Sequence, residues 1–155
     1  MNRSMIEAHP MGICSWDYTV NIAGKRASLL HRVWGESGSI FADARHMDIV
    51  KQGSFSGHWM LEEAGRVIAT AQKTSAFTRS SRIVANGSAC DLRADSAFTR
   101  MMRLSGEGYD CVYAPVHPFT RRATISGSWQ DDAVMIFGFW LVILMWRRAA
   151  RHAAA

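Results

Sequence analysis

Apolar and polar residues alternate with a period of two along most of the chain, from about Trp16 to Ser128. This period is typical of β-strands with one buried face. Short clusters of glycine and polar residues interrupt the alternation, and Asn86-Gly87 is a strong signal for a type I′ hairpin turn. The pattern predicts an antiparallel meander of short strands over this whole region.

Part of the meander repeats at an interval of 21 residues. Ser-Ala-Phe-Thr-Arg occurs at Ser75–Arg79 and again at Ser96–Arg100, and Phe-Thr-Arg returns at Phe119–Arg121. Two columns of small or apolar residues come into register when the copies are aligned: Ile83, Leu104 and Ile125, and Ala69, Cys90 and Cys111. Each unit is expected to hold one strand, a bend near Phe-Thr-Arg and a second strand.

The period changes after Asp132. The next fourteen residues, Ala133 to Trp146 (AVMIFGFWLVILMW), contain no charged or polar side chain, and arginines follow them. Acids before and bases after such a segment match the dipole of an α-helix, with Asp132 as the expected N-cap residue. A helix over about 132–150 that is apolar on every side has to be enclosed by protein or by lipid.

As a membrane span this helix is short, because fourteen apolar residues rise about 21 Å against roughly 30 Å of hydrocarbon. A span would also place the arginines that follow it on the far side, against the positive-inside rule. The meander supplies about ten to twelve strands, enough for a barrel wide enough to hold a helix. We therefore predict a mainly β protein, a closed antiparallel β-barrel of about 12 strands around a central hydrophobic C-terminal α-helix. The alternative is a small single-pass protein with Ala133 to Trp146 in the bilayer.

The length of 155 residues and the hydrophobic content of 48% indicate one domain with a real core. We expect an N-terminal tail over residues 1–15 and a single domain over 16–155. The three cysteines form no Cys-x-x-Cys pair, and the N-terminus has no continuous hydrophobic segment that would indicate a signal peptide. These features predict a cytoplasmic protein, with association to a membrane surface as a further expectation.

A long meander that ends in a hydrophobic helix resembles the tubby C-terminal superfamily, which includes LURP-one-related proteins and phospholipid scramblases. The resemblance is carried by the repeated Ser-Ala-Phe-Thr-Arg, by Trp59–Lys73 and by Phe137–Arg148, and it covers roughly residues 16–150 as an architecture. In that superfamily the last helix fills the barrel, and tubby domains bind phosphoinositide headgroups through basic surface residues. The resemblance implies lipid binding as a class of function. The cysteine-rich segment and calcium motif of scramblases are not found.

The arginines of the repeat, Arg79, Arg100 and Arg121, are the candidate site. If Phe77 faces the barrel interior, Arg79 shares its strand parity, and the same relation holds in the other two copies. The bend would place all three guanidinium groups at one rim, where they would form a site for an anion or a phosphate group. The competing interpretation is that they pair with acids at the mouth, namely Asp131, Asp132, Asp95 or the helix terminus.

Other candidates for chemistry are weak. The six histidines have no metal-ligand spacing, so we expect no metal, and no nucleotide fingerprint indicates a cofactor. Gly53-Ser-Phe-Ser-Gly57 has Phe55 where a nucleophile elbow needs serine. Cys90 and Cys111 take equivalent repeat positions and are explained as buried small side chains, with a redox pair as the alternative. No constellation indicates catalysis.

The net charge of +5 is dispersed along the chain and includes no run of five basic residues. Anionic lipid, nucleic acid and an ordinary solvated surface are all compatible with it, and no nucleic-acid-binding fold signature is present. We predict a non-enzymatic, monomeric barrel module that binds anionic phospholipid or phosphate-bearing ligands at a basic rim.

Overall fold

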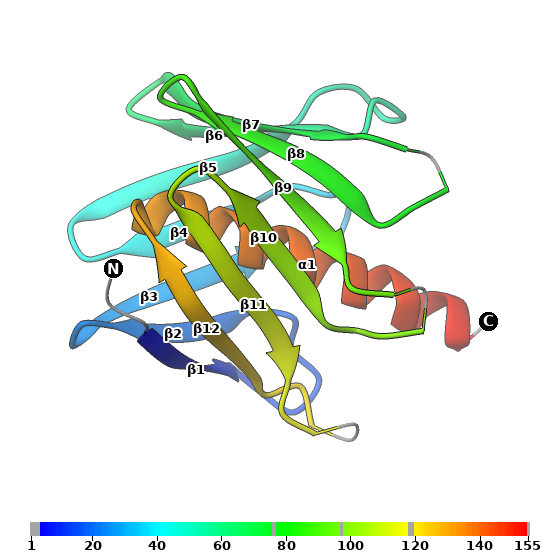
Figure 1. Ribbon diagram of the computed structural model, residues 1–155. Helices are drawn as coiled ribbons and strands as arrows, with labels where there is room; N and C mark the ends of the chain where they lie inside the picture. Colours follow the sequence, from blue (N-terminus) through cyan, green and yellow to red (C-terminus); the bar gives the residue numbers. More distant parts are fainter. Residues whose placement is uncertain (1–3, 76, 97, 118–119, 155) are drawn as a thin grey trace.

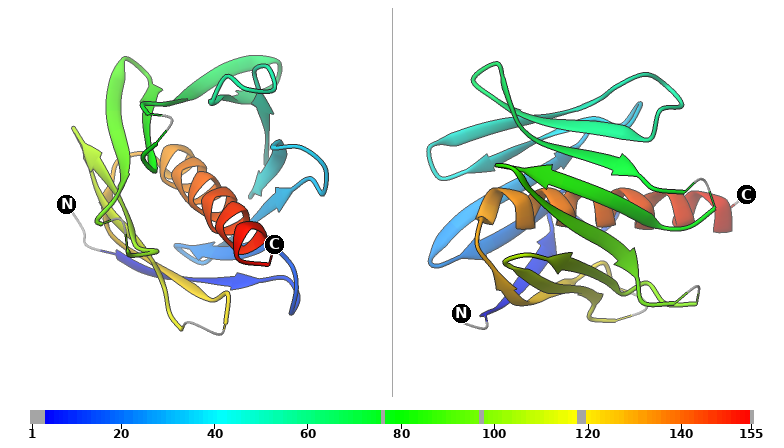
Figure 2. Two further views of the ribbon diagram at one scale, coloured as in Figure 1. Left: turned by 90° about the vertical axis from the view of Figure 1, so that its right-hand side faces the viewer. Right: turned by 45° about the horizontal axis from the view of Figure 1, so that its top comes forward.

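The computed structural model describes residues 4–75, 77–96, 98–117 and 120–154, and over these residues the chain forms a closed β-barrel around one α-helix (Figure 1). Seen along the helix, the strands form a ring with the helix at its centre (Figure 2, left). The prediction of a closed antiparallel barrel around a hydrophobic C-terminal helix is confirmed.

Every strand is short, as the period-two segments of the sequence predict. The twelve strands of the described chain are β1 (Ser4–Pro10), β2 (Tyr18–Ile22), β3 (Lys25–His31), β4 (Gly38–Ala42), β5 (Arg45–Lys51), β6 (His58–Glu63), β7 (Arg66–Lys73), β8 (Ser80–Ala85), β9 (Ser88–Ala94), β10 (Met102–Gly106), β11 (Tyr109–Pro115) and β12 (Ala123–Trp129). Each strand pairs antiparallel with its neighbours in sequence, and β1 pairs with β12 to close the barrel.

The first strand corrects the expectation of an N-terminal tail over residues 1–15. Within that range Ser4–Pro10 forms β1, in which Ile6 lies opposite Ile125 and Ala8 opposite Ala123. The side chains of Ile6 and Ala8 are buried. Alternation over so few residues, with Glu7, His9 and Pro10 among them, gave too weak a signal, although closure of the barrel requires this strand.

The connections divide the barrel into two unlike ends. At one end, two-residue turns at 23–24, 43–44, 64–65, 86–87 and 107–108 join the strands. Asn86 and Gly87 have φ of 50° and 76°, as the predicted type I′ turn requires. At the other end the connections are longer, at residues 11–17, 32–37, 52–57, 74–79, 95–101 and 116–122. The bends near Phe-Thr-Arg, which the repeat predicted, are three of these long connections.

The helix α1 (Asp132–Ala153) enters the barrel at the end with the short turns and leaves it at the end with the long connections (Figure 1). Its N-cap is Asp131, whose carboxylate accepts a hydrogen bond from the Ala133 N–H, so the expected N-cap was one residue too late. The helix is long and apolar enough to cross a membrane, but 78% of its most apolar window is buried inside the protein. The barrel thus supplies the enclosure, and a bilayer span does not describe this fold.

The aligned columns of the repeat all face the core. Ile83, Leu104 and Ile125 are buried, as are their counterparts Ala69, Cys90 and Cys111. The alternation of β7 places Val67 on the same face as Ala69 and Ala71, but Val67 is half-exposed while those two residues are buried. A bulge in the β6–β7 pairing at Leu61 and Glu62 shifts the register there.

Polar atoms of the core fix the helix inside the barrel. The Trp140 indole donates to the Leu30 carbonyl at 3.0 Å, and the Tyr113 hydroxyl donates to the Met135 carbonyl at 2.7 Å. His31 stacks on Trp140 with ring centroids 4.4 Å apart. Gly38 makes this close approach possible, because a Cβ there would lie 2.8 Å from the indole nitrogen of Trp140 and 2.0 Å from the Leu30 oxygen. These contacts therefore favour one depth and rotation of the helix.

Candidate functional site: the loop end of the barrel

The six long connections, the strand residues that border them, and helix residues 147–154 form one end of the molecule, which we call the loop end. Its charged side chains are mostly basic. In the described chain the bases are Arg32, Lys51, Lys73, Arg79, Arg100, Arg121, Arg122, Arg147, Arg148 and Arg151, and the acids are Asp17, Glu36 and Asp95. A surplus of this size creates a positive potential over the whole end.

The opposite end has the reverse balance. We call the short turns, their bordering strand residues and residues 129–132 the hairpin end. Its described bases are Lys25, Arg45 and Arg66, and its described acids are Asp43, Glu63, Glu107, Asp131 and Asp132. The modest net charge of the chain therefore conceals a separation of charge along the barrel axis.

The three predicted site arginines all lie in the long connections, at one rim as expected. Phe77 and Phe98 do not face the interior, as the parity argument for the rim required, but are almost fully exposed. Both lie between strands, where the alternation of a strand no longer applies. Phe119 lies outside the described residues.

Arg100 and Arg121 meet at one hollow of about 360 Å³ beside the end of the helix. Arg121 lies 3.8 Å from the ring centroid of Trp16 and donates to the Ser15 carbonyl at 2.9 Å. Arg100 lies 5.4 Å from the ring centroid of Trp146. Cation–π contacts leave part of the N–H fork of a guanidinium available for oxygen atoms of a ligand.

Arg79 lies apart from this pair, in a neighbouring hollow that it shares with Phe77. Its guanidinium donates to the Ser96 carbonyl at 2.9 Å and so connects two adjacent long connections. The structure thus brings two of the three arginines together and places the third beside them.

The competing interpretation, in which the triplet pairs with acids, fails for two of the named acids. Asp131 and Asp132 lie at the hairpin end, where their charges act on Arg45. The third acid, Asp95, has its Oδ1 atom 3.6 Å from Nε of Arg103, which is not one of the triplet. Within the described residues, no carboxylate forms an ion pair with Arg100 or Arg121.

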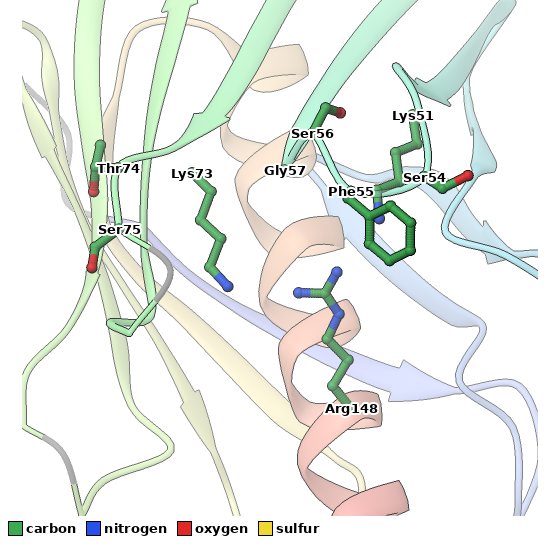
Figure 3. A pocket seen from close by; sticks show the side chains of 9 residues that line it. All are labelled: Lys51, Ser54, Phe55, Ser56, Gly57, Lys73, Thr74, Ser75 and Arg148. Atoms are coloured by element: carbon green, nitrogen blue, oxygen red, sulfur yellow. The ribbon is translucent and has the colours of Figure 1, made fainter.

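A second basic hollow, of about 470 Å³, was not predicted. Its bases are Lys51 at the end of β5, Lys73 at the end of β7 and Arg148 from the helix. The charged ends of Lys73 and Arg148 point toward each other across the hollow, with the Phe55 ring beside them (Figure 3). Hydroxyl groups complete the lining: Ser54, Ser56, Thr74 and Ser75.

Glu36 holds two of these three bases in place. It pairs with Lys51 and with Arg148. Burial alone would raise the pKa of the Glu36 carboxyl, but the hydrogen bonds from Arg148 and Lys51 outweigh burial and keep that pKa below its usual range. Over the described residues, no acid forms an ion pair with Lys73. The hollow therefore keeps a net positive charge after its internal pairing.

The buried end of the helix supports this rim. Arg147 donates to the carbonyls of Arg32 and Gly35 at 2.8 and 2.9 Å. Burial lowers the pKa of Arg147, although a guanidinium stays protonated at any physiological pH. Arg147 is thus a structural residue that fixes the connection between β3 and β4.

The two cysteines of the repeat, Cys90 and Cys111, are buried in the core as free thiols. Burial raises the pKa of Cys90 to about 11 and that of Cys111 to about 12, so both are protonated thiols of low reactivity at neutral pH. They lie on either side of β10, opposite Gly106 and Leu104. Among the described residues, no group of three or more histidine, cysteine or acidic side chains could hold a metal ion.

Comparisons of this chain with protein-family models, with curated proteins and with solved structures find no match.

Proposed function

We propose that this protein is a non-enzymatic binding module of tubby-like architecture that recognises anionic, phosphate-bearing groups at the loop end. Such groups occur on phospholipid headgroups and on soluble polyphosphates. The observation that carries the proposal is the convergence of Arg100 and Arg121 on one hollow whose described residues offer them no carboxylate partner.

The chemistry of both basic hollows fits a phosphate group. Guanidinium groups form forked hydrogen bonds with phosphate oxygens, and the lysine ammonium groups add point charges. In the second hollow, the hydroxyl-bearing residues Ser54, Ser56, Thr74 and Ser75 line the wall beside Lys73 and Arg148. The positive surplus of the loop end also favours encounter with anionic surfaces in the correct orientation.

The test replaces Arg79, Arg100 and Arg121 together by glutamine and measures sedimentation with vesicles of phosphatidylcholine and phosphatidylserine. Each base near an anionic surface contributes about 1 kcal/mol to the free energy of binding, so we expect the loss of three bases to lower the affinity for vesicles roughly a hundredfold. The melting temperature should change by only a few degrees, because these side chains are exposed or half-buried.

The matched control removes the same charge from the hairpin end and the adjoining residue of β3, by Lys25→Gln, Arg26→Gln and Arg66→Gln. This control should bind vesicles nearly as well as the native chain. A second arm competes the native protein off vesicles with inorganic polyphosphate. Equal losses in both triple variants would show that only net charge matters, and the proposed site would then be wrong.

A further inference from the structure

The loop end exposes large apolar side chains as well as bases. Five of its six long connections each carry one that is between 89% and 101% exposed: Ile13, Trp34, Phe55, Phe77 and Phe98. The sixth connection contains Phe119, which lies outside the described residues. Elsewhere in the described chain the most exposed large apolar side chain is Met5, at 75%. The most exposed apolar groups are thus gathered at the end that carries the most positive charge.

These two kinds of side chain follow an order along the barrel axis. The bases lie near the strand ends: Lys51 and Lys73 are the last residues of their strands, and Arg79 directly precedes β8. The apolar residues lie in the middle of the connections, as Phe55 does in 52–57 and Phe77 in 74–79. In these connections the apolar residue is therefore farther along the chain from the strand ends than the base is.

We infer that the loop end is a docking surface for an anionic lipid bilayer. Its five exposed apolar side chains, which we call the tips, would lie in the acyl region, and the bases would lie at headgroup level. This inference rests on the proposed function, because the same bases would bind the headgroups. The order of groups matches that of a bilayer surface, in which charged headgroups precede hydrocarbon. The barrel axis, and α1 with it, would stand across the membrane plane with the C-terminus facing the lipid.

A second copy of this chain fits the surface less well. Protein interfaces have a contiguous core depleted of charged residues, especially lysine. Here single apolar side chains from separate connections alternate with arginine and lysine, and the helix end between them carries Arg148 and Arg151. Two such surfaces face to face would also bring like charges together.

Trp34 provides a direct probe of insertion. It is 89% exposed, whereas the other described tryptophans are buried or half-buried. With vesicles of phosphatidylserine and acyl-brominated phosphatidylcholine, we expect strong quenching of the native protein. The quenched part of the emission should disappear in Trp34→Phe. Vesicles of phosphatidylcholine alone should give little quenching, because the bases are needed to bring the tips to the surface.

Two further variants measure the contribution of the apolar side chains to vesicle binding separately from that of the bases. Replacing Ile13, Trp34 and Phe98 by serine should lower vesicle affinity roughly tenfold or more. The direct binding of inorganic polyphosphate to the bases should stay unchanged, because none of the three residues lines a basic hollow. The control replaces three apolar residues of the barrel wall, Met5, Val67 and Val84, by serine. It should bind vesicles like the native chain.

Each remaining outcome has a definite meaning. If the arginine variant loses vesicle binding while the tip variant binds normally and Trp34 is not quenched, the docking inference is overturned and the proposed function stands. If polyphosphate binds through the arginines but vesicles do not bind at all, the docking inference is again overturned and the proposed function again stands. Binding that needs the tips and ignores the arginines would overturn the proposed function instead. Light scattering that shows a dimer, dissociated by the tip substitutions, would identify the loop end as an interface between copies.

Discussion

The two ends of the barrel are built from the same strands but differ in connections, charge and exposed side chains. At the hairpin end, tight turns hold a slight excess of acids and expose no large apolar tip among the described residues. At the loop end, connections of six or seven residues carry a surplus of bases and almost all of the fully exposed apolar side chains. A structural connection needs only two residues, so the extra length at one end is available for recognition.

The helix relates the two ends to each other. Its N-terminal acids lie at the hairpin end and its C-terminal arginines at the loop end, so the sequence pattern that favours the helix dipole also reinforces the charge separation. Arg147 and Arg148 connect the helix to Gly35 and Glu36 at the loop end. Any change that expels the helix should therefore disrupt both ends at once.

The largest effect is expected from Leu144→Asp or Trp140→Asp. Both side chains are fully buried against the barrel wall, and an aspartate there would be a buried charge without a partner. We expect a loss of several kcal/mol, enough to prevent folding of a domain of this size. Circular dichroism and gel filtration measure the loss. The control Ala149→Asp, on an exposed part of the same helix, should fold normally, and a soluble, cooperative Leu144→Asp variant would contradict an enclosed helix.

The next effect is a dependence of stability on pH that originates at the loop end. Burial is the main cause that lowers the pKa of His31 to about 4, opposed by its hydrogen bond to the Trp140 carbonyl and aided by the charge of Arg147. Asp17 accepts a hydrogen bond from the backbone N–H of His31 at 2.7 Å. The unfolded chain, with a histidine pKa near 6.5, binds the proton first as pH falls.

The contribution of neutral His31 to the free energy of unfolding should therefore be fully present above about pH 6.5. It should fall by about 3 kcal/mol as pH decreases to about 4, and His31 should cause no further change below that pH. Urea unfolding at a series of pH values measures it. His31→Gln keeps a polar side chain at the site and cannot titrate, so it should flatten the slope over this window. An unchanged slope in the variant would assign the acid sensitivity to carboxylates elsewhere.

The smallest effect concerns the hairpin end. Ala64 has φ of 51°, a backbone conformation whose free energy is higher for alanine than for asparagine. Asn86 occupies the equivalent turn position with φ of 50°. Ala64→Asn should stabilise the protein by about 0.5–1 kcal/mol, and Asn86→Ala should destabilise it by a similar amount. Thermal unfolding measures both. Neither change should alter vesicle binding, and a change in binding would show that the hairpin end takes part in recognition.

Local patterns were enough to predict most of the fold. Alternation and the 21-residue repeat predicted the strands and bends from about residue 16 onward, and the uninterrupted apolar segment predicted the enclosed helix. The failures also have local causes. The alternation in β1 is short and polar, the bulge near Leu61 reverses the parity of Val67, and Phe77 lies beyond the end of its strand.

The site was less predictable because it depends on closure of the barrel. The repeat made Arg79, Arg100 and Arg121 visible as a set, but not the separation of Arg79 from the other two. Lys51, Lys73 and Arg148 come from three separate elements, and no spacing in the sequence relates them. The nearest signal is Gly53–Gly57, which lacks the serine that a catalytic turn needs and whose last four residues line the second hollow instead.

The most direct test of the central claim, that one end of the barrel is the binding end, is amide hydrogen exchange of the full chain with and without vesicles of phosphatidylcholine and phosphatidylserine. The account predicts slower exchange in the six long connections and around Arg147–Arg151, with no change at the turns 23–24, 43–44, 64–65, 86–87 and 107–108. Protection centred on those turns or on the barrel wall, or equal protection at both ends, would contradict it.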